Sequence, residues 1–434
     1  MKRMALSVAL LSILLLVSCL GRYVQRTDLS SENVMVNRIA YVDSLGIVYT
    51  VSGDGTGRQQ MSGSSYVGTG SSGSVMAQGL NFEAFHSWPT WSPDGSKLAV
   101  SRIGMGDAEQ PSISIVIIDV VSGRSRNIDD VNVVGMVAEN SPHYLYWAPD
   151  SRHLSFLAST RVGLSLFMVD TDNGDINAID TGAPLYYSWS GDGLSMIVHT
   201  GTSIKLFENL DSGISGKDLS RASGFRAPAF SKDGSRMAYL SETDQGVSLK
   251  VVASDDLKEV SVGDLGRFSA FMWSPSSNQI AIADQDDDRN SVFNRLRIFS
   301  ADGNLENILV EEPFIAYFWS PDGRRLAWVG LDLENEGFQW KVKDVTGSSS
   351  KIIFNFQPSR DQLTVLSFFD QYAYSNSPWS PDSTKLVVSG TKTIPFEQRN
   401  GHTPAGARIY VLDVEGVNDP LDIAEGSFAS WSWN

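Results

Sequence analysis

One short phrase recurs along this chain and constrains its fold more than any other feature. The clearest copy is Trp91-Ser-Pro-Asp-Gly95, and the apolar stretch Leu98-Ala99-Val100 follows it. Seven copies and a truncated eighth begin at aromatic residues spaced 41 to 60 positions apart, namely Trp91, Trp147, Trp189, Phe230, Trp273, Trp319, Trp379 and Trp431. A period of roughly 40 to 50 residues predicts a chain built from repeated four-stranded units.

The residue types in the phrase predict a strand, a tight turn and a second strand. Proline presets φ, aspartate accepts backbone N–H bonds, and glycine adopts the left-handed conformation that closes a hairpin. The repeated aspartates are therefore expected to cap turns rather than to act as acid–base pairs: Asp94, Asp150, Asp192, Asp233, Asp322 and Asp382. The apolar strand that follows, with its small middle residue, suits a sheet that is covered on both faces.

The two ends of the chain complete each other. Arg38–Val42 and Ile47–Gly53 match the strands that normally follow the turn, and Phe428–Trp433 matches the strand before it. Joining these segments in one sheet would close a ring without an unpaired edge. The sequence thus predicts an all-β fold, a β-propeller of eight four-stranded blades whose last blade combines N- and C-terminal strands. Seven blades is the alternative, because the copies at Trp189 and Phe230 are degraded.

The phrase Trp-Ser-Pro-Asp-Gly-x-x-Leu-Ala resembles the repeat of the TolB-like β-propeller family, and the resemblance covers nearly all of the chain after residue 37. Proteins of the WD-repeat family share the turn, but their Gly-His and Trp-Asp signatures are missing here. The Gly-x-Ser-x-Gly motif of propeller-bearing hydrolases is missing as well. The resemblance implies a module for binding or assembly, without naming its ligand.

The N-terminus indicates export and lipid anchoring. Lys2 and Arg3 precede an apolar run, Met4–Val17, that is too short to span a membrane. Leu16-Val17-Ser18-Cys19 resembles the lipobox of bacterial lipoproteins, in which the cysteine receives the lipid. We therefore expect a signal peptide at 1–18, lipidation of Cys19, a linker at 19–36 and one propeller domain at 37–434. A plain secretory signal or a buried cysteine is the alternative. The expected location is the extracytoplasmic side of the cell envelope, in the outer membrane or periplasm of a Gram-negative cell.

Composition and local motifs limit the partners. The net charge of −16 disfavours nucleic acid, whose phosphates it repels. Gly68–Gly73 spells Gly-x-Gly-x-x-Gly, but no strand precedes it, so a flexible loop is expected. The run from Asp284 to Asp288 lacks the glycine and glutamate of a calcium loop, which favours a solvated acidic loop. No cofactor and no metal site are predicted.

Loop lengths indicate which face of the propeller binds. The turns within each repeat are short on one face, whereas the other face carries long segments such as Met61–His86, Asp129–His143, Gln357–Ser377 and Thr391–Thr403. Binding usually involves variable loops on a rigid scaffold. The candidate binding residues on this long-loop face are Phe82, Phe85, His86, Trp88, His143, Phe368, Phe369, Tyr372, Phe396 and His402.

Two functions fit these residues. The first is a lipid-anchored scaffold that binds a protein or peptide through the long-loop face. The alternative is a glycan-active enzyme, a lyase or hydrolase, that uses the acidic loops or brings together His86, His143 and His402. The aromatic candidates have a purely structural interpretation too, because they can pack beneath the long loops.

Overall fold

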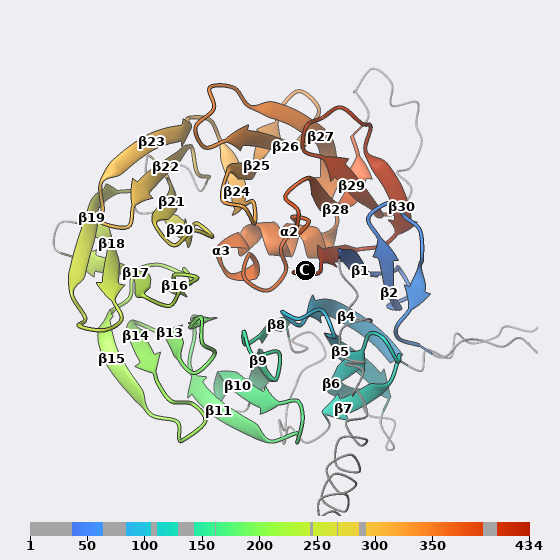
Figure 1. The fold of residues 1–434 in the computed structure, drawn as a ribbon, viewed down its shortest axis with the longest axis horizontal. Helices are drawn as coiled ribbons and strands as arrows, with labels where there is room; N and C mark the ends of the chain where they lie inside the picture. Colours follow the sequence, from blue (N-terminus) through green and yellow to red (C-terminus); the bar gives the residue numbers. More distant parts are fainter. Residues whose placement is uncertain are drawn as a thin grey trace, which may run out of the picture. The chain divides into compact units, whose positions relative to one another are not determined.

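The structure is a computed structural model that describes residues 37–63, 84–105, 111–128, 143–160, 162–243, 246–266, 268–285, 292–393 and 406–434. Cys19, Phe82, Phe396 and His402 lie outside these ranges. Residues 35–434 form one compact unit. Its antiparallel sheets stand around a common centre, as Figure 1 shows. No helix within the described ranges is long and apolar enough to cross a membrane.

Six blades are built from four consecutive strands each. The first three are β4 (Ala84–Trp91), β5 (Lys97–Met105), β6 (Pro111–Asp119) and β7 (Ser125–Ile128); β8 (His143–Trp147), β9 (His153–Thr160), β10 (Gly163–Asp170) and β11 (Ile176–Thr181); and β12 (Leu185–Trp189), β13 (Met196–Thr200), β14 (Ser203–Phe207) and β15 (Gly216–Arg221). The next three are β16 (Ala229–Phe230), β17 (Arg236–Thr243), β18 (Gly246–Ala253) and β19 (Glu259–Leu265); β20 (Ala270–Trp273), β21 (Gln279–Asp284), β22 (Arg295–Ser300) and β23 (Leu305–Val310); and β24 (Phe314–Trp319), β25 (Arg325–Asp332), β26 (Gly337–Asp344) and β27 (Lys351–Pro358).

The seventh blade in chain order contains β28 (Lys385–Lys392), β29 (Arg408–Asp413) and β30 (Leu421–Glu425). A single bridge from Trp379 to Leu386 stands where its innermost strand would be. Pairing of β27 with β28 joins this blade to the preceding one. The close approach requires glycine at Gly390, since a Cβ there would lie 2.2 Å from the carbonyl oxygen of Gln357.

The last blade combines both ends of the described chain. Its strands follow the order β3 (Gln59–Gln60), β2 (Val48–Ser52), β1 (Arg38–Val42) and β31 (Phe428–Trp431). In the register of β1 and β31, Ile39 faces Trp431 and Val42 faces Phe428. The described residues therefore form eight blades, and the predicted eight-bladed propeller with a composite closing blade is confirmed.

In six blades, the tryptophan of the repeat forms a hydrogen bond to the blade before it. Trp147 Nε1 donates a hydrogen bond to the carbonyl oxygen of Thr90 at 3.0 Å, just before the aromatic residue of the preceding blade. The same bond runs from Trp91 to Ser430, Trp189 to Tyr146, Trp273 to Ala229, Trp319 to Met272 and Trp379 to Phe318. Phe230 has no donor, and Trp431 Nε1 has no hydrogen-bond partner within the described ranges.

Each turn of the repeat is held by its own side chains. Asp94 Oδ1 accepts hydrogen bonds from the Ser92 hydroxyl at 2.7 Å and from the Ser96 N–H at 3.0 Å. Equivalent pairs of bonds form around Asp192, Asp233, Asp322 and Asp382. Burial raises the pKa of Asp94, but these bonds outweigh it and hold that pKa below the ordinary value. The aspartates thus act as turn caps.

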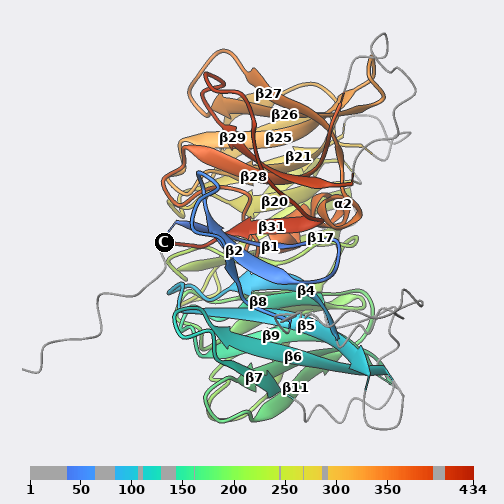
Figure 2. The same ribbon diagram turned by 90° about the vertical axis from the view of Figure 1, so that its right-hand side faces the viewer.

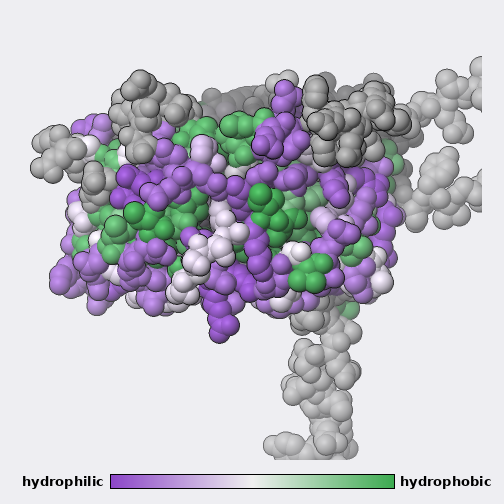
Figure 3. Space-filling model, turned by 90° about the horizontal axis from the view of Figure 1, so that it is seen from above, coloured by the Kyte–Doolittle hydropathy of each residue, from purple (hydrophilic) through white to green (hydrophobic). Residues whose placement is uncertain are grey.

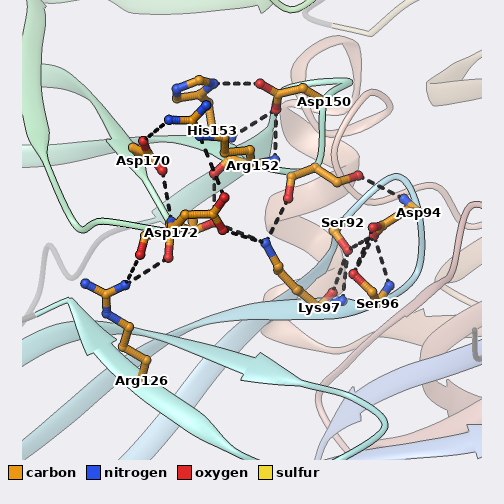
Figure 4. Close-up of polar contacts among 12 residues, drawn as sticks. Ser92, Asp94, Ser96, Lys97, Arg126, Asp150, Arg152, His153, Asp170 and Asp172 are labelled. Carbon is orange, nitrogen blue, oxygen red and sulfur yellow. Dashed lines mark hydrogen bonds and ion pairs between the residues drawn. The ribbon is translucent and has the colours of Figure 1, made fainter. Parts of the chain in front are cut away.

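Neighbouring turns are also bonded to each other. Ser151 replaces the turn glycine with a positive φ of 57°, and its hydroxyl accepts a hydrogen bond from the Asp94 N–H at 3.1 Å. Lys97 Nζ crosses to the carbonyl oxygen of Ser151 and to Asp172 (Figure 4). The serine bond recurs between Ser277 and Asp233 and between Ser383 and Asp322. Where serine occupies this left-handed position, its hydroxyl therefore stabilises the contact between blades.

The segment predicted as the long loop Gln357–Ser377 contains two helices, α2 (Arg360–Ser367) and α3 (Phe369–Tyr372), that lie in the middle of the ring (Figure 1). Figure 2 shows α2 on one face of the ring and the C-terminus on the opposite face. Ser359 caps α2 by accepting a hydrogen bond from the Gln362 N–H at 3.0 Å. We call residues 359–377 the plug.

Candidate binding site at the mouth of the central channel

The end of the channel opposite α2 contains a cavity of about 310 Å³. It lies on the face of the short Ser-Pro-Asp-Gly turns, and the inner strands of most blades surround it. Ala373 and Tyr374 of the plug line its inner end. The cavity is therefore blind, with its mouth at the short-turn face and its floor formed by the plug.

One position of the repeat builds the mouth. The third residue of the phrase lines the cavity in seven blades, as Pro149, Gly191, Lys232, Pro275, Pro321, Pro381 and Trp433. Gly191 and Lys232 depart from proline in neighbouring blades, and Trp433 departs in the closing blade. Lys232 thereby places a cation on one side of the mouth, and Trp433, which is 36% exposed, adds a large aromatic ring to the rim.

The wall is mainly aromatic. It includes Tyr146, Trp189, Phe230, Trp273, Phe318, Trp319 and Trp379, together with Met272. The serines beside them are engaged in turns, since the Ser190 and Ser231 hydroxyls donate to Asp192 and Asp233. Burial raises the pKa of both Tyr146 and Tyr374, so these phenols stay neutral. Lys232 is the one charged side chain among the described residues that line the cavity.

The other end of the channel is closed by the packed plug. Phe369 is fully buried. The centroid of its ring lies 4.9 Å from that of Tyr317 and 5.8 Å from that of Phe293. Tyr372 is also buried and stacks on Trp88 at 5.4 Å. The expectation that Phe369 and Tyr372 form an exposed binding surface is therefore corrected, and Trp88 is half-buried against them. Their large apolar surfaces fill the centre of the ring, where hydrophobic burial favours them.

A buried polar pair anchors the plug. Asp370 Oδ2 accepts a hydrogen bond from the Ala227 N–H at 3.1 Å, and Oδ1 lies 3.7 Å from Arg226 Nη1. Burial raises the pKa of the Asp370 carboxyl, and the nearby Arg226 opposes that shift. The Tyr144 hydroxyl donates to the carbonyl oxygen of Gln371 at 2.9 Å. The plug thus depends on contacts to several blades, and its position is a tertiary property.

The remaining candidates on the long-loop face differ in how far they are exposed to solvent. Phe85 is 41% exposed and Phe368 is 43% exposed, so both can contact a partner. His86 is buried, and burial lowers its pKa. His143 begins β8, but its side chain lies outside the described part of the structure. Of the three histidines predicted to come together, only His86 has a side chain within the described part of the structure, so their grouping stays a prediction.

Asp284 and His153, two of the described titratable residues, have structural partners. Asp284 is fully buried and accepts hydrogen bonds from Arg295 at 2.9 Å and from Arg297 at 2.6 Å. His153 Nδ1 lies 2.6 Å from Asp150 Oδ2 on the short-turn face (Figure 4). In the described ranges, no group of three or more histidine, cysteine, aspartate and glutamate residues is arranged to hold a metal ion.

The outer wall offers a less defined surface than the channel mouth. Leu305 and Ile308 on β23 are 51% and 44% exposed, and Ile352 on β27 is 55% exposed. Figure 3 shows apolar patches on this side of the molecule that polar side chains separate. Isolated exposed apolar residues are common on protein surfaces. The cavity is therefore the better candidate site.

The rim residues of the cavity were not among the binding candidates from the sequence, although a signal for them exists there. Proline at the third position of the repeat changes to Gly191, Lys232 and Trp433 in three copies. At this position, three blades therefore carry different side chains on the same turn scaffold. Knowing that this position rims the channel requires the folded ring.

Comparisons with known proteins support the fold. No family model matches the chain, and no curated protein matches it. Dihydro-heme d1 dehydrogenase NirN in complex with DHE is similar over 92% of this chain and 76% of its own, with 12% identity and a TM-score of 0.53. A prolyl endopeptidase structure is similar over 81% of this chain and 50% of its own, with 10% identity and a TM-score of 0.50.

TolB from Acinetobacter baumannii is also similar, over 64% of each chain, with 17% identity and a TM-score of 0.36. This chain thus spans less than two thirds of that protein. At these identities a structural likeness shows the fold alone. The strands define the class of the fold as a β-propeller, and the two structures with TM-scores of 0.53 and 0.50 support it.

Proposed function

We propose that this protein is a binding module that takes a segment of a protein or peptide partner into the mouth of its central channel. The observation that carries the proposal is the blind, aromatic-lined cavity of about 310 Å³. Cavities of roughly 300 to 1,000 Å³ with apolar walls and few polar groups are typical ligand sites. The TolB-like repeat points to the same class of function.

The physical properties of the cavity suit binding better than catalysis. Its aromatic wall offers a large apolar area at little cost in side-chain entropy, because the rings are already held by the blades. The phrase that builds the wall is also the one that bonds the blades together. A ligand would therefore meet a rigid surface, which favours affinity through preorganisation.

The long-loop face predicted from sequence stays a second place where a partner could dock. Phe85 and Phe368 are exposed there. We favour the short-turn face because it has a preformed cavity, whereas the plug fills the channel at the long-loop end. The glycan-active alternative stays a prediction, and activity against a broad polysaccharide panel would support it.

Site-specific photo-cross-linking in cells tests the proposal. A benzophenone amino acid at Pro321, on the cavity rim, should capture one recurrent protein, and the same probe at Phe368 on the opposite face should not. Trp433→Ala should weaken capture from Pro321 at unchanged stability, and Phe368→Ala is the matched control. Capture from Phe368 alone would move the site to the long-loop face. Absence of any recurrent partner at both positions would count against a binding module.

We also propose that Cys19 carries the lipid that holds the protein at the extracytoplasmic membrane surface. The lipobox-like Leu16–Cys19 supports this assignment. Metabolic labelling with an alkyne fatty acid should mark the wild-type protein and leave Cys19→Ser unlabelled. Labelling that persists in Cys19→Ser would overturn the assignment.

A further inference from the structure

We infer that the cavity recognises a chain end: a C-terminal apolar side chain enters the channel while its carboxylate pairs with Lys232. This inference rests on the proposed peptide binding and specifies its chemistry. A carboxylate attached to an apolar residue matches a cavity with an apolar wall and a single cation at its mouth.

The charge of the lining residues points to an anionic group on the ligand. Lys232 is the charged residue among the described residues that line the cavity, and its side chain is exposed at the rim. Asp233, the next residue, accepts hydrogen bonds from Ser231 and Ser235 within the turn. Its carboxylate is therefore directed to the turn, and Lys232 is the exposed cation beside the cavity.

The shape of the cavity favours a chain end over a continuous strand. Ala373 and Tyr374 line the floor, so an extended peptide cannot pass through the channel. A terminal residue can place its side chain against Trp319 and Tyr374 while its carboxylate remains at the mouth. The carboxylate then stays partly hydrated, which avoids the large cost of burying a charge.

The repeat itself supplies the control for this inference. Five copies of the phrase carry proline at the position of Lys232, namely Pro93, Pro149, Pro275, Pro321 and Pro381. Proline is therefore compatible with the turn, and Lys232→Pro removes the cation without introducing a foreign residue. Lys258→Gln removes an exposed cation from the turn between β18 and β19 of the same blade, away from the cavity.

The experiment compares Ac-Ser-Gly-Ser-Phe with a free C-terminal carboxylate and the same peptide as an amide. Dissociation constants come from intrinsic tryptophan fluorescence of the propeller, with calorimetry as a check. An exposed ion pair typically contributes a few tenths to 1 kcal/mol, so the acid should bind about two- to fivefold more tightly than the amide. Lys232→Pro should bring the ratio close to one, Lys258→Gln should leave it unchanged, and high salt should reduce it.

Each contrary outcome identifies what fails. Equal affinity for acid and amide in the wild type overturns the carboxylate pairing and leaves peptide binding in place. Tighter binding of decanoate than of either peptide overturns the peptide occupant in favour of a small amphiphile. Binding of neither peptide overturns the chain-end inference, whereas the proposed function is judged separately by cross-linking from Pro321.

Discussion

The two ends of the central channel are built in different ways. The short-turn end is made from the repeat, so successive blades contribute equivalent residues and leave a cavity at the centre. The long-loop end is filled by the plug, which among the described residues occurs in one blade and places Phe369 fully buried among residues of other blades. The repeated turns thus surround an open mouth of the channel, whereas the plug fills its other end.

The difference also separates two kinds of stabilising contact. At the repeated end, indole and serine hydrogen bonds recur from blade to blade, so the loss of one leaves the others in place. At the plug, Asp370 and Arg226 form a buried pair that is not part of the repeated phrase. We therefore expect single substitutions to have larger effects in the plug than in the repeat.

The largest effect is expected for Phe369→Ala. This side chain is fully buried, and removing a buried phenylalanine typically costs about 3 to 5 kcal/mol. Chemical denaturation should show that loss in the free energy of unfolding. Phe368→Ala is the matched control, because its ring is 43% exposed and should change stability by less than about 1 kcal/mol. Equal effects of the two substitutions would contradict the packed plug.

Asp370→Ala should destabilise the protein by about 3 kcal/mol, since it leaves the Arg226 guanidinium buried without its carboxylate. The double variant Arg226→Met with Asp370→Leu should recover most of that loss, because a buried ion pair can often be replaced by apolar residues. Urea denaturation of the single and double variants measures both. A double variant as unstable as Asp370→Ala would argue against the pair as the anchor.

A smaller effect distinguishes tryptophans within the repeat. Trp147 and Trp431 are both 2% exposed, but only the Trp147 Nε1 has a hydrogen-bond acceptor in the described structure. Trp147→Phe should therefore cost about 1 kcal/mol more than Trp431→Phe. Parallel unfolding curves of the two variants give the difference. A larger loss at Trp431 would mean that the indole bonds do not hold the blades together.

The smallest expected effect is a pH dependence of the plug. Burial raises the pKa of Asp370 above its ordinary value of 3.8. Folding thus favours the protonated form of the Asp370 carboxyl. The stability that this carboxyl contributes is fully present below its pKa in the unfolded chain, and it is lost as pH rises through its pKa in the folded protein. The stability of the wild type relative to Asp370→Asn should decrease from pH 4 to pH 8. An increase over that range would show that Arg226 outweighs the cost of burial.

Much of the fold could be predicted from the sequence, because each copy of the repeat specifies the same strand and turn. The turn aspartates, the small Ala281 and Ala327 in the strands, and the composite closing blade all follow from local residue preferences. The helix α2 was missed, although Ser359-Arg-Asp-Gln362 matches the capping-box pattern at a helix start. A helix of eight residues has little stability by itself, so its sequence signal is weak.

The candidate site could be predicted only in part. The sequence reveals that Gly191, Lys232 and Trp433 interrupt a row of prolines, but these residues are far apart along the chain. Conversely, Phe369 and Tyr372 stand in a segment whose length suggested an exposed loop, and they are buried. Exposure is a property of the assembled ring, and residue type or loop length does not determine it.

By itself, the sequence determined the repeating strand and turn and the way the ends close the ring, because these depend on local geometry that is specified in every copy. It left eight and seven blades as alternatives, and the structure decided for eight. The tertiary structure alone decided which end of the channel is filled and which is left as a cavity. The physical reason is that the plug is stabilised by burial against several blades at once, and those contacts exist only after the ring has closed.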